Sequence, residues 1–105
     1  MAQFDVYKNP SKQTREYFPY LLDIQNPLLE DIATRIVVPL GLPKGFLSQG
    51  MKNLTPEMEY KGQSLILAVP QIASISKSVL SVVDGSLADC RDVVIAALDF
   101  AIVGI

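Results

Sequence analysis

Hydrophobic and polar residues alternate along the N-terminal third of the chain in the two-residue period of β-strands. In QFDVYK, Phe4 and Val6 fall on one side, whereas Gln3, Asp5 and Tyr7 fall on the other, which predicts a strand with one buried face. The segments YFPYLLDIQ and ATRIVVPL continue this pattern, and Pro19 predicts an edge position for the outer part of the second segment. Strands separated by Asn-Pro turns are therefore predicted over Gln3–Lys8, Tyr17–Gln25 and Ala33–Leu40.

The middle of the chain combines an irregular stretch with a hairpin pattern. The glycine-rich segment Gly41–Asn53 follows no period, which predicts a loop. The next segment, Thr55–Pro70, predicts a hairpin with a strand to Tyr60, a Lys-Gly turn and a buried strand over Ser64–Val69. Serine and valine dominate Gln71–Val83, which favours one or two further short strands.

The C-terminal segment changes to the period of an α-helix. After a predicted break at Asp84–Ser86, one helix is expected over Leu87–Val103, with Ser86 as N-cap and Asp89 completing a capping box. Its least apolar positions recur at steps of three and four and form one narrow stripe, which consists of Asp89, Asp92, Ala96, Asp99 and Val103. A helix this apolar needs cover beyond its own sheet, most simply from a second copy of the chain; the alternative is a helix wholly buried by its own barrel.

This order of elements, strands first and one helix last, predicts a mainly β fold of the α+β class. A small barrel or sandwich would pack against the C-terminal helix. The length of 105 residues fits one domain over residues 1–105.

Composition narrows the class of partners. The net charge is −2 and like charges do not cluster, so direct binding to nucleic acid through phosphate neutralisation is disfavoured. Cys90 is the only cysteine, which excludes an intramolecular disulfide and fits the reducing cytoplasm. The apolar segment VVIAALDFAIVGI is shorter than the roughly 20 residues that span a bilayer, so no membrane partner is expected.

The side chains needed for catalysis are sparse. The chain contains no histidine, which excludes Ser-His and Cys-His nucleophile pairs, and no phosphate-binding glycine motif occurs. Cys90 is interpreted as a small residue in or beside the core. The acidic pairs Glu30/Asp31 and Glu57/Glu59 are best explained by solvation. No catalytic residue, metal or cofactor is predicted, and an enzyme is disfavoured.

The order of four segments resembles the CcdB family of toxins from bacterial toxin–antitoxin modules. These segments are QFDVYK, YLLDIQNPLLE, TRIVVPL and a C-terminal helix ending in Gly-Ile. The resemblance covers residues 3–105. It implies a homodimer of a small SH3-like β-barrel with extra strands and one C-terminal α-helix.

The resemblance also implies a function. Toxins of this family bind the DNA gyrase A subunit and trap the gyrase–DNA cleavage complex without covalent chemistry of their own. A CcdA-like antitoxin neutralises them, and the resulting complex, rather than the toxin alone, binds operator DNA and represses transcription.

Family residues transfer onto this chain position by position. They place a gyrase-binding surface at Asp23, Asn26, Leu28, Leu29, Arg35, Ala96, Asp99, Val103, Gly104 and Ile105. The part on the helix coincides with the stripe that the period predicts. Val103 replaces a tryptophan of the best-known member, and Asp99 replaces an asparagine. The alternative is therefore a degenerate, non-toxic module that dimerises and binds antitoxin but not gyrase.

Overall fold

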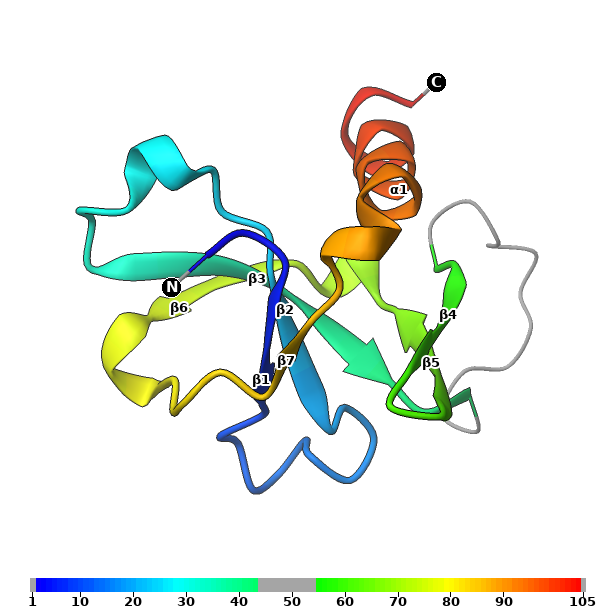
Figure 1. The fold of residues 1–105 in the computed structure, drawn as a ribbon, viewed down its shortest axis with the longest axis horizontal. Coiled ribbons are helices and arrows are strands. Elements are labelled where there is room, and N and C mark those ends of the chain that lie inside the picture. Colours follow the sequence, from blue (N-terminus) through cyan, green and yellow to red (C-terminus); the bar gives the residue numbers. More distant parts are fainter. Residues whose placement is uncertain (1, 44–54, 105) are drawn as a thin grey trace.

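The chain folds into one curled antiparallel sheet followed by a single α-helix (Figure 1). The computed structural model describes residues 2–43 and 55–104. The strands are β1 (Asp5–Lys8), β2 (Tyr20–Asp23), β3 (Thr34–Gly41), β4 (Glu57–Tyr60), β5 (Gln63–Leu67), β6 (Ala73–Ser76) and β7 (Gly85–Ser86). The helix is α1 (Arg91–Val103), and the short 3-10 helices are η1 (Pro27–Leu29), η3 (Val69–Gln71), η4 (Lys77–Val79) and η5 (Ala88–Cys90). The predicted mainly β, α+β class is confirmed, with the sheet curled as half of a barrel.

Strand β3 organises the sheet because both of its edges are paired. The sheet order is β4-β5-β3-β2-β1-β7, and β6 pairs with β3 outside this path. Pro39 lies where one edge of β3 changes partner from β6 to β5, and its carbonyl accepts a hydrogen bond from Ala68 N–H at 2.9 Å. A proline is tolerated in this central strand because no ladder hydrogen bond requires its nitrogen. The predicted strand Ala33–Leu40 is confirmed, shifted by one residue.

Strand β1 is buried on both faces, so the prediction of a single buried face is wrong. Val6 lies in the main core, whereas Tyr7 is fully buried on the opposite face, where Leu80 covers it. The strand begins at Asp5 because Phe4 has a φ of 71°, which interrupts the extended backbone.

Strand β2 is shorter than the predicted segment Tyr17–Gln25, and it lies inside the sheet. The N–H groups of Tyr17 and Phe18 donate to the carbonyl of Thr14 at 3.1 and 2.8 Å, so the chain is still turning there. Pairing with both β1 and β3 corrects the edge position predicted from Pro19. This proline precedes the strand and therefore removes no ladder hydrogen bond.

The hairpin predicted over Thr55–Pro70 is confirmed. Lys61 and Gly62 connect β4 to β5 with φ angles of 51° and 76°, as a tight two-residue hairpin turn requires. Strand β6 confirms a short strand within Gln71–Val83. The loop predicted over Gly41–Asn53 lies mostly outside the described residues.

The segment Asp84–Ser86 is not the predicted break, because it contains the strand β7. Ser86 pairs with Asp5, and Gly85 pairs with Val6. The chain thus returns to β1 before the helical region begins, and β7 forms one edge of the sheet.

The helical region consists of η5 and α1 rather than one helix from Leu87. The Leu87 side chain is buried in the core, and its N–H donates to the carbonyl of Phe4 at 2.9 Å. The Ser86 hydroxyl accepts from Ala88 N–H at 3.1 Å, before the 3-10 turn. The capping box predicted for Ser86 and Asp89 is wrong, since Cys90 is the N-cap of α1 and its side chain makes no capping hydrogen bond.

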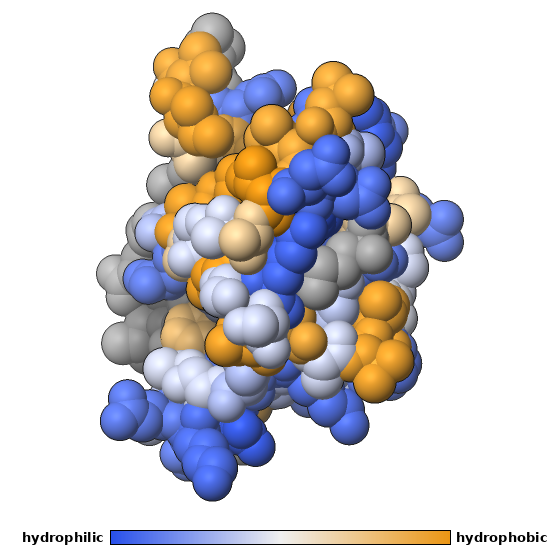
Figure 2. All heavy atoms as spheres, turned by 90° about the vertical axis from the view of Figure 1, so that its left-hand side faces the viewer, coloured by the Kyte–Doolittle hydropathy of each residue, from blue (hydrophilic) through white to orange (hydrophobic). Residues whose placement is uncertain are grey.

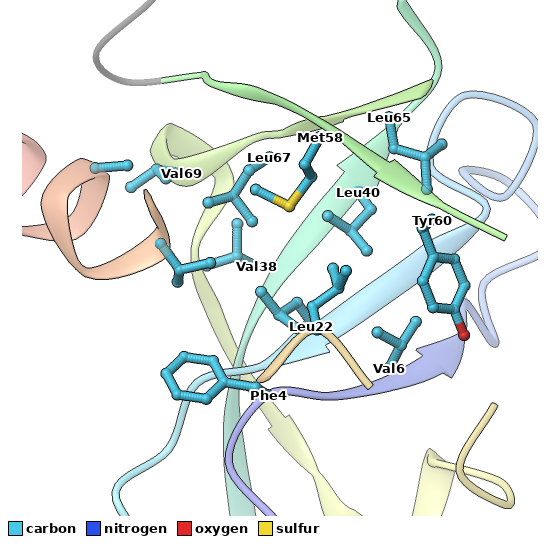
Figure 3. Close-up of a cluster of buried hydrophobic side chains, with 13 residues drawn as sticks. Phe4, Val6, Leu22, Val38, Leu40, Met58, Tyr60, Leu65, Leu67 and Val69 are labelled. Atoms are coloured by element: carbon cyan, nitrogen blue, oxygen red, sulfur yellow. The ribbon is translucent and has the colours of Figure 1, made fainter. Parts of the chain in front are cut away.

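The main core lies between the curled sheet and α1, and Figure 3 shows side chains from several strands converging there. Helix α1 contributes Val94 and Ala97, which are 0% and 3% exposed, and it packs against η3. Cys90 packs against this core, which confirms its prediction as a small residue in or beside the core. The buried members are Phe4, Val6, Leu22, Val38, Leu40, Met58, Tyr60, Leu65, Leu67, Val69, Leu87, Val94 and Ala97.

A polar contact joins the β4–β5 hairpin to Asp84, the residue before β7. The Tyr60 hydroxyl donates to Asp84 Oδ2 at 2.5 Å, and Lys61 Nζ lies 3.0 Å from the same oxygen. Burial raises the pKa of Tyr60, and the bond to Asp84 raises it further. That hydrogen bond, with help from Lys61, lowers the pKa of Asp84. Gly85 is required beside it, because a Cβ there would collide with the Tyr60 hydroxyl.

Candidate functional site: an exposed leucine turn and the end of the helix

A short turn after β2 holds two leucines in solvent. We call residues Asn26–Glu30 the leucine turn. The Asn26 carbonyl and its side-chain oxygen each accept one N–H, from Leu29 and Leu28 respectively, both at 2.9 Å. Pro27 is favoured at the first position of η1 because its φ is already helical and it has no N–H to satisfy. Leu28 is 90% exposed and Leu29 is 45% exposed.

Beneath this turn lies a buried ion pair. Arg35 donates through Nε to Asp23 Oδ2 at 2.8 Å, and its Nη2 lies 2.6 Å from the same oxygen. Asp23 ends β2 and Arg35 lies near the start of β3, so the two strands that flank the loop supply one partner each. Both side chains are fully buried. Burial raises the pKa of Asp23, against the opposing effects of Gln25 N–H and Arg35.

Gln25 connects this ion pair to the leucine turn. Its backbone N–H donates to Asp23 Oδ1 at 2.9 Å. Its side-chain Nε2 donates to the carbonyl of Leu29 at 2.7 Å, and its Oε1 accepts from Ile36 N–H at 3.0 Å. The Gln25 side chain is fully buried, so it spans the loop from inside the protein.

The buried Tyr7 hydroxyl lies close enough to this ion pair for both of its charges to affect the pKa of Tyr7. Burial raises the pKa of the Tyr7 hydroxyl, Asp5 and Asp23 raise it further, and Arg35 lowers it. Among residues 2–43 and 55–104, neither the Tyr7 hydroxyl nor Arg35 Nη1 has a hydrogen-bond partner. The pair therefore sits in an environment where removal of one charge would leave the other without compensation.

The outer face of α1 is the second part of the site. Ala96, Asp99, Val103 and Gly104 are all exposed, as the stripe predicts. Gly104 ends the helix with a φ of 80°, and its N–H donates to the carbonyl of Phe100 at 3.0 Å, which is a left-handed C-cap. Ile105 lies outside the described residues.

The exposed apolar surface of α1 is wider than the predicted stripe. Val93, Ile102 and Val103 are 46%, 73% and 62% exposed. This exposure excludes the alternative of a helix wholly buried by its own barrel. It also means that the outer face presents aliphatic side chains around Asp99 rather than a narrow polar line.

The leucine turn and the C-terminal end of α1 project from the same side of the molecule, the upper side in Figure 1, with the turn toward the left and the helix toward the right. Figure 2 shows hydrophobic atoms on the upper part of the molecule, whereas hydrophilic atoms dominate its lower end. The structure thus places the leucine turn on the side of the protein that also carries the end of α1, with a gap between them.

Two predicted gyrase-binding residues do not reach the surface. Asp23 and Arg35 are 0% and 1% exposed, so in this fold they support the loop from within. Gln25 was missed as a site residue. Its signal was its position two residues after Asp23, since in a strand this spacing places both polar side chains on one face of an otherwise apolar segment.

Over residues 2–43 and 55–104, no three His, Cys, Asp or Glu side chains come together as a group that could hold a metal ion. Within the same ranges, no helix is both long enough and apolar enough to cross a bilayer.

Comparison with known proteins identifies the family. No curated protein matches the sequence significantly. The family model described as CcdB protein matches residues 3–104, which is nearly the whole chain and includes both the leucine turn and the end of α1. The chain therefore belongs to the CcdB family.

Proposed function

We propose that this protein is the toxin of a type II toxin–antitoxin module and that it acts by binding the DNA gyrase A subunit and trapping the gyrase–DNA cleavage complex. Membership of the CcdB family supports the toxin role. The observation that carries the proposal further is Leu28, which is 90% exposed on an ordered turn. Large apolar side chains held in solvent in this way are typical of contact surfaces.

The proposed gyrase surface consists of the leucine turn and the exposed end of α1. Both expose aliphatic side chains on the same side of the molecule, and Asn26 and Asp99 add polar groups to the surface. Asp23 and Arg35 contribute by holding the loop, since both are buried. This division separates residues that touch the target from residues that shape the surface.

We further propose that the protein works in the cytoplasm as a homodimer without catalysing a reaction. A second copy would cover the aliphatic side chains that α1 leaves exposed, such as Val93 and Ile102. A CcdA-like antitoxin would neutralise the toxin, and operator DNA would be bound only by the toxin–antitoxin complex. The absence of histidine from the sequence and the packing of Cys90 against the core are in keeping with a binding function.

Expression in a gyrase-sensitive bacterial host tests the toxin proposal. The wild-type chain should arrest growth and induce the DNA-damage response, and co-expression of a CcdA-like antitoxin should restore growth. A Leu28→Asp variant is the matched control, because that side chain makes no core contact and the variant should fold but lose toxicity. Normal growth with soluble wild-type protein present would contradict the proposal.

The second candidate is a non-toxic module that dimerises and binds antitoxin but not gyrase. It is favoured by Val103, which is an exposed aliphatic residue where an aromatic anchor would bind more strongly. Separate titrations with a gyrase A fragment and a CcdA-like peptide distinguish the two candidates. Peptide binding without gyrase binding selects the non-toxic module, whereas binding of both supports the toxin.

A further inference from the structure

The leucine turn is too short to hold its own conformation. It contains one three-residue 3-10 helix with local hydrogen bonds between Asn26, Leu28 and Leu29. Short 3-10 segments have poor hydrogen-bond geometry, and an isolated helical turn is unfavourable because nucleation costs more than one bond returns. The Leu28 side chain is exposed, so it adds no hydrophobic stabilisation to the turn. Anchors from the rest of the fold must therefore keep it ordered.

Gln25 provides the principal anchor. Its carboxamide donates to the Leu29 carbonyl at 2.7 Å and accepts from Ile36 N–H at 3.0 Å, so one side chain ties the turn to the far side of the loop. Asp23 accepts the Gln25 backbone N–H and is itself held by Arg35. The chain of contacts runs without a gap from a fully buried ion pair to the backbone that carries Leu28.

A second anchor lies on the opposite side of the turn. Lys77, at the start of η4, donates through Nζ to the carbonyl of Glu30, and its backbone N–H donates to Ala33 at 3.0 Å. The Lys77 bond to Glu30 is solvent-exposed, whereas the Gln25 side chain is fully buried and its two carboxamide bonds are partly buried. Water cannot readily replace the hydrogen bonds of a buried side chain, so Gln25 should contribute more than Lys77 to the order of the turn.

We propose that Gln25 is a positioning residue for the partner-binding surface, and that its carboxamide fixes the leucine turn so that Leu28 and Leu29 are presented to gyrase already ordered. The inference rests on the proposed function for the identity of the partner. The ordering of the turn by Gln25 in the free protein does not depend on that function. Preordering a contact loop raises affinity because less conformational entropy is lost on binding.

The first test is amide hydrogen exchange on the free, full-length chain. Gln25→Met keeps a similar volume but removes both hydrogen bonds to the loop, and exchange at Leu28, Leu29 and Glu30 should rise about tenfold or more. Tyr60→Phe is the matched control, since it removes a side-chain hydrogen bond made by a buried residue elsewhere in the sheet. It should leave exchange in the turn unchanged. Equal exchange in wild type and Gln25→Met would overturn the proposal.

The second test is the affinity for a purified gyrase A fragment, measured in two backgrounds. Gln25→Met should weaken binding about tenfold in the wild-type chain and less than about twofold in a Leu28→Ala chain, because a positioning residue acts through the side chain that it positions. Equal losses in the two backgrounds would show a general structural effect and overturn the proposal. Failure of wild type to bind the fragment overturns the proposed function instead, while the exchange result still decides whether Gln25 holds the turn.

A second variant, Lys77→Met, still tests the proposal if Gln25→Met fails to fold. Lys77→Met removes only the exposed bond to Glu30 and should fold normally. It should raise exchange in the leucine turn and weaken gyrase binding in the same direction as Gln25→Met, by about threefold at most. An effect equal to or larger than that of Gln25→Met would overturn the assignment of the principal anchor to Gln25.

Discussion

The two parts of the candidate site expose similar apolar side chains but are held in place by different forces. The leucine turn depends on a buried polar network that includes Gln25 and the Asp23–Arg35 pair. The end of α1 depends on the helix backbone and on the left-handed cap at Gly104. The leucine turn is ordered by contacts with the interior of the sheet, whereas the end of α1 is ordered largely by the hydrogen bonds of its own helix.

The two parts of the site should therefore be sensitive to different substitutions. A change in the buried network should disorder the leucine turn and leave the end of α1 intact. A change at Gly104 should do the reverse, because the Gly104 N–H donates to the Phe100 carbonyl within the helix itself. Substitutions can therefore disorder one part of the site without the other. The expected losses of stability decrease from Asp23→Ala to Leu28→Ala.

Replacement of Asp23 by alanine should have the largest effect. The change leaves the Arg35 guanidinium buried without its counter-charge, which should lower the free energy of unfolding by about 3–5 kcal/mol. Urea denaturation followed by circular dichroism measures this loss. Asp99→Ala, at an exposed position on α1, is the control and should stay within about 0.5 kcal/mol of wild type. A small effect of Asp23→Ala would show that the network does not support the loop.

The Tyr60–Asp84 contact provides a polar reference outside both parts of the site. Tyr60→Phe should lower the free energy of unfolding by about 2 kcal/mol through loss of a hydrogen bond to a charged acceptor. Its effect on gyrase binding per folded molecule should be absent. Reduced binding at full folding would remove the distinction between this contact and the Gln25 network.

The same contact gives the protein a pH dependence at each extreme. The folded pKa of Tyr60 is raised, so wild type should lose stability as the pH rises above about 10, where the unfolded tyrosine ionises. The folded pKa of Asp84 is lowered, so its contribution is present above about pH 4 and is lost as the pH falls through the folded value. Urea denaturation of wild type and Tyr60→Phe at several pH values measures both slopes, and the variant should show a weaker dependence at both ends.

Gly104→Ala tests the helical part of the site, the C-terminal end of α1. The φ of 80° is strained for a residue with a Cβ. Apart from its chain neighbours and its own helix backbone, no atom of the described residues lies within 4 Å of a Cβ built there, so the loss should be about 1 kcal/mol and purely conformational. Thermal unfolding measures it. Gly104→Asn should lose less than Gly104→Ala, because asparagine tolerates the left-handed region. Hydrogen exchange in the leucine turn should not change in either variant, and a change there would couple the two parts.

Leu28→Ala should have the smallest effect on stability. Its side chain is 90% exposed, so the free energy of unfolding should stay within about 0.5 kcal/mol of wild type. Denaturation under the same conditions as for Asp23→Ala provides the check. A loss above 1 kcal/mol would mean that Leu28 packs in the fold rather than serving a partner.

The elements with a clear period could be predicted from the sequence. The β3 strand, the Lys61–Gly62 hairpin and the exposed positions of α1 follow from alternation, turn chemistry and the helical step. The burial of Tyr7 could not be predicted, because it depends on Leu80, distant in sequence, folding over the second face of the sheet. The start of the helix could not be predicted for a similar reason. The Leu87 N–H donates to the carbonyl of Phe4, which is distant in sequence.

The candidate site was predictable in its outline but not in the roles of its residues. The resemblance to the CcdB family selected Asp23 and Arg35 together with Leu28, although the first two are buried and the third is exposed. A sequence does not distinguish a residue that touches a partner from one that holds the touching residue in place. In the structure, by contrast, the Gln25 carboxamide hydrogen-bonds to the backbone of Leu29 and Ile36, which identifies it as a residue that holds the turn in place.

Isothermal titration calorimetry can compare how a purified gyrase A fragment binds the wild-type chain and Leu28→Ala. Wild type should bind, and Leu28→Ala, though equally well folded, should bind at least about tenfold more weakly. Equal affinity of the two chains, or no binding by the wild type, would contradict a gyrase contact through the leucine turn.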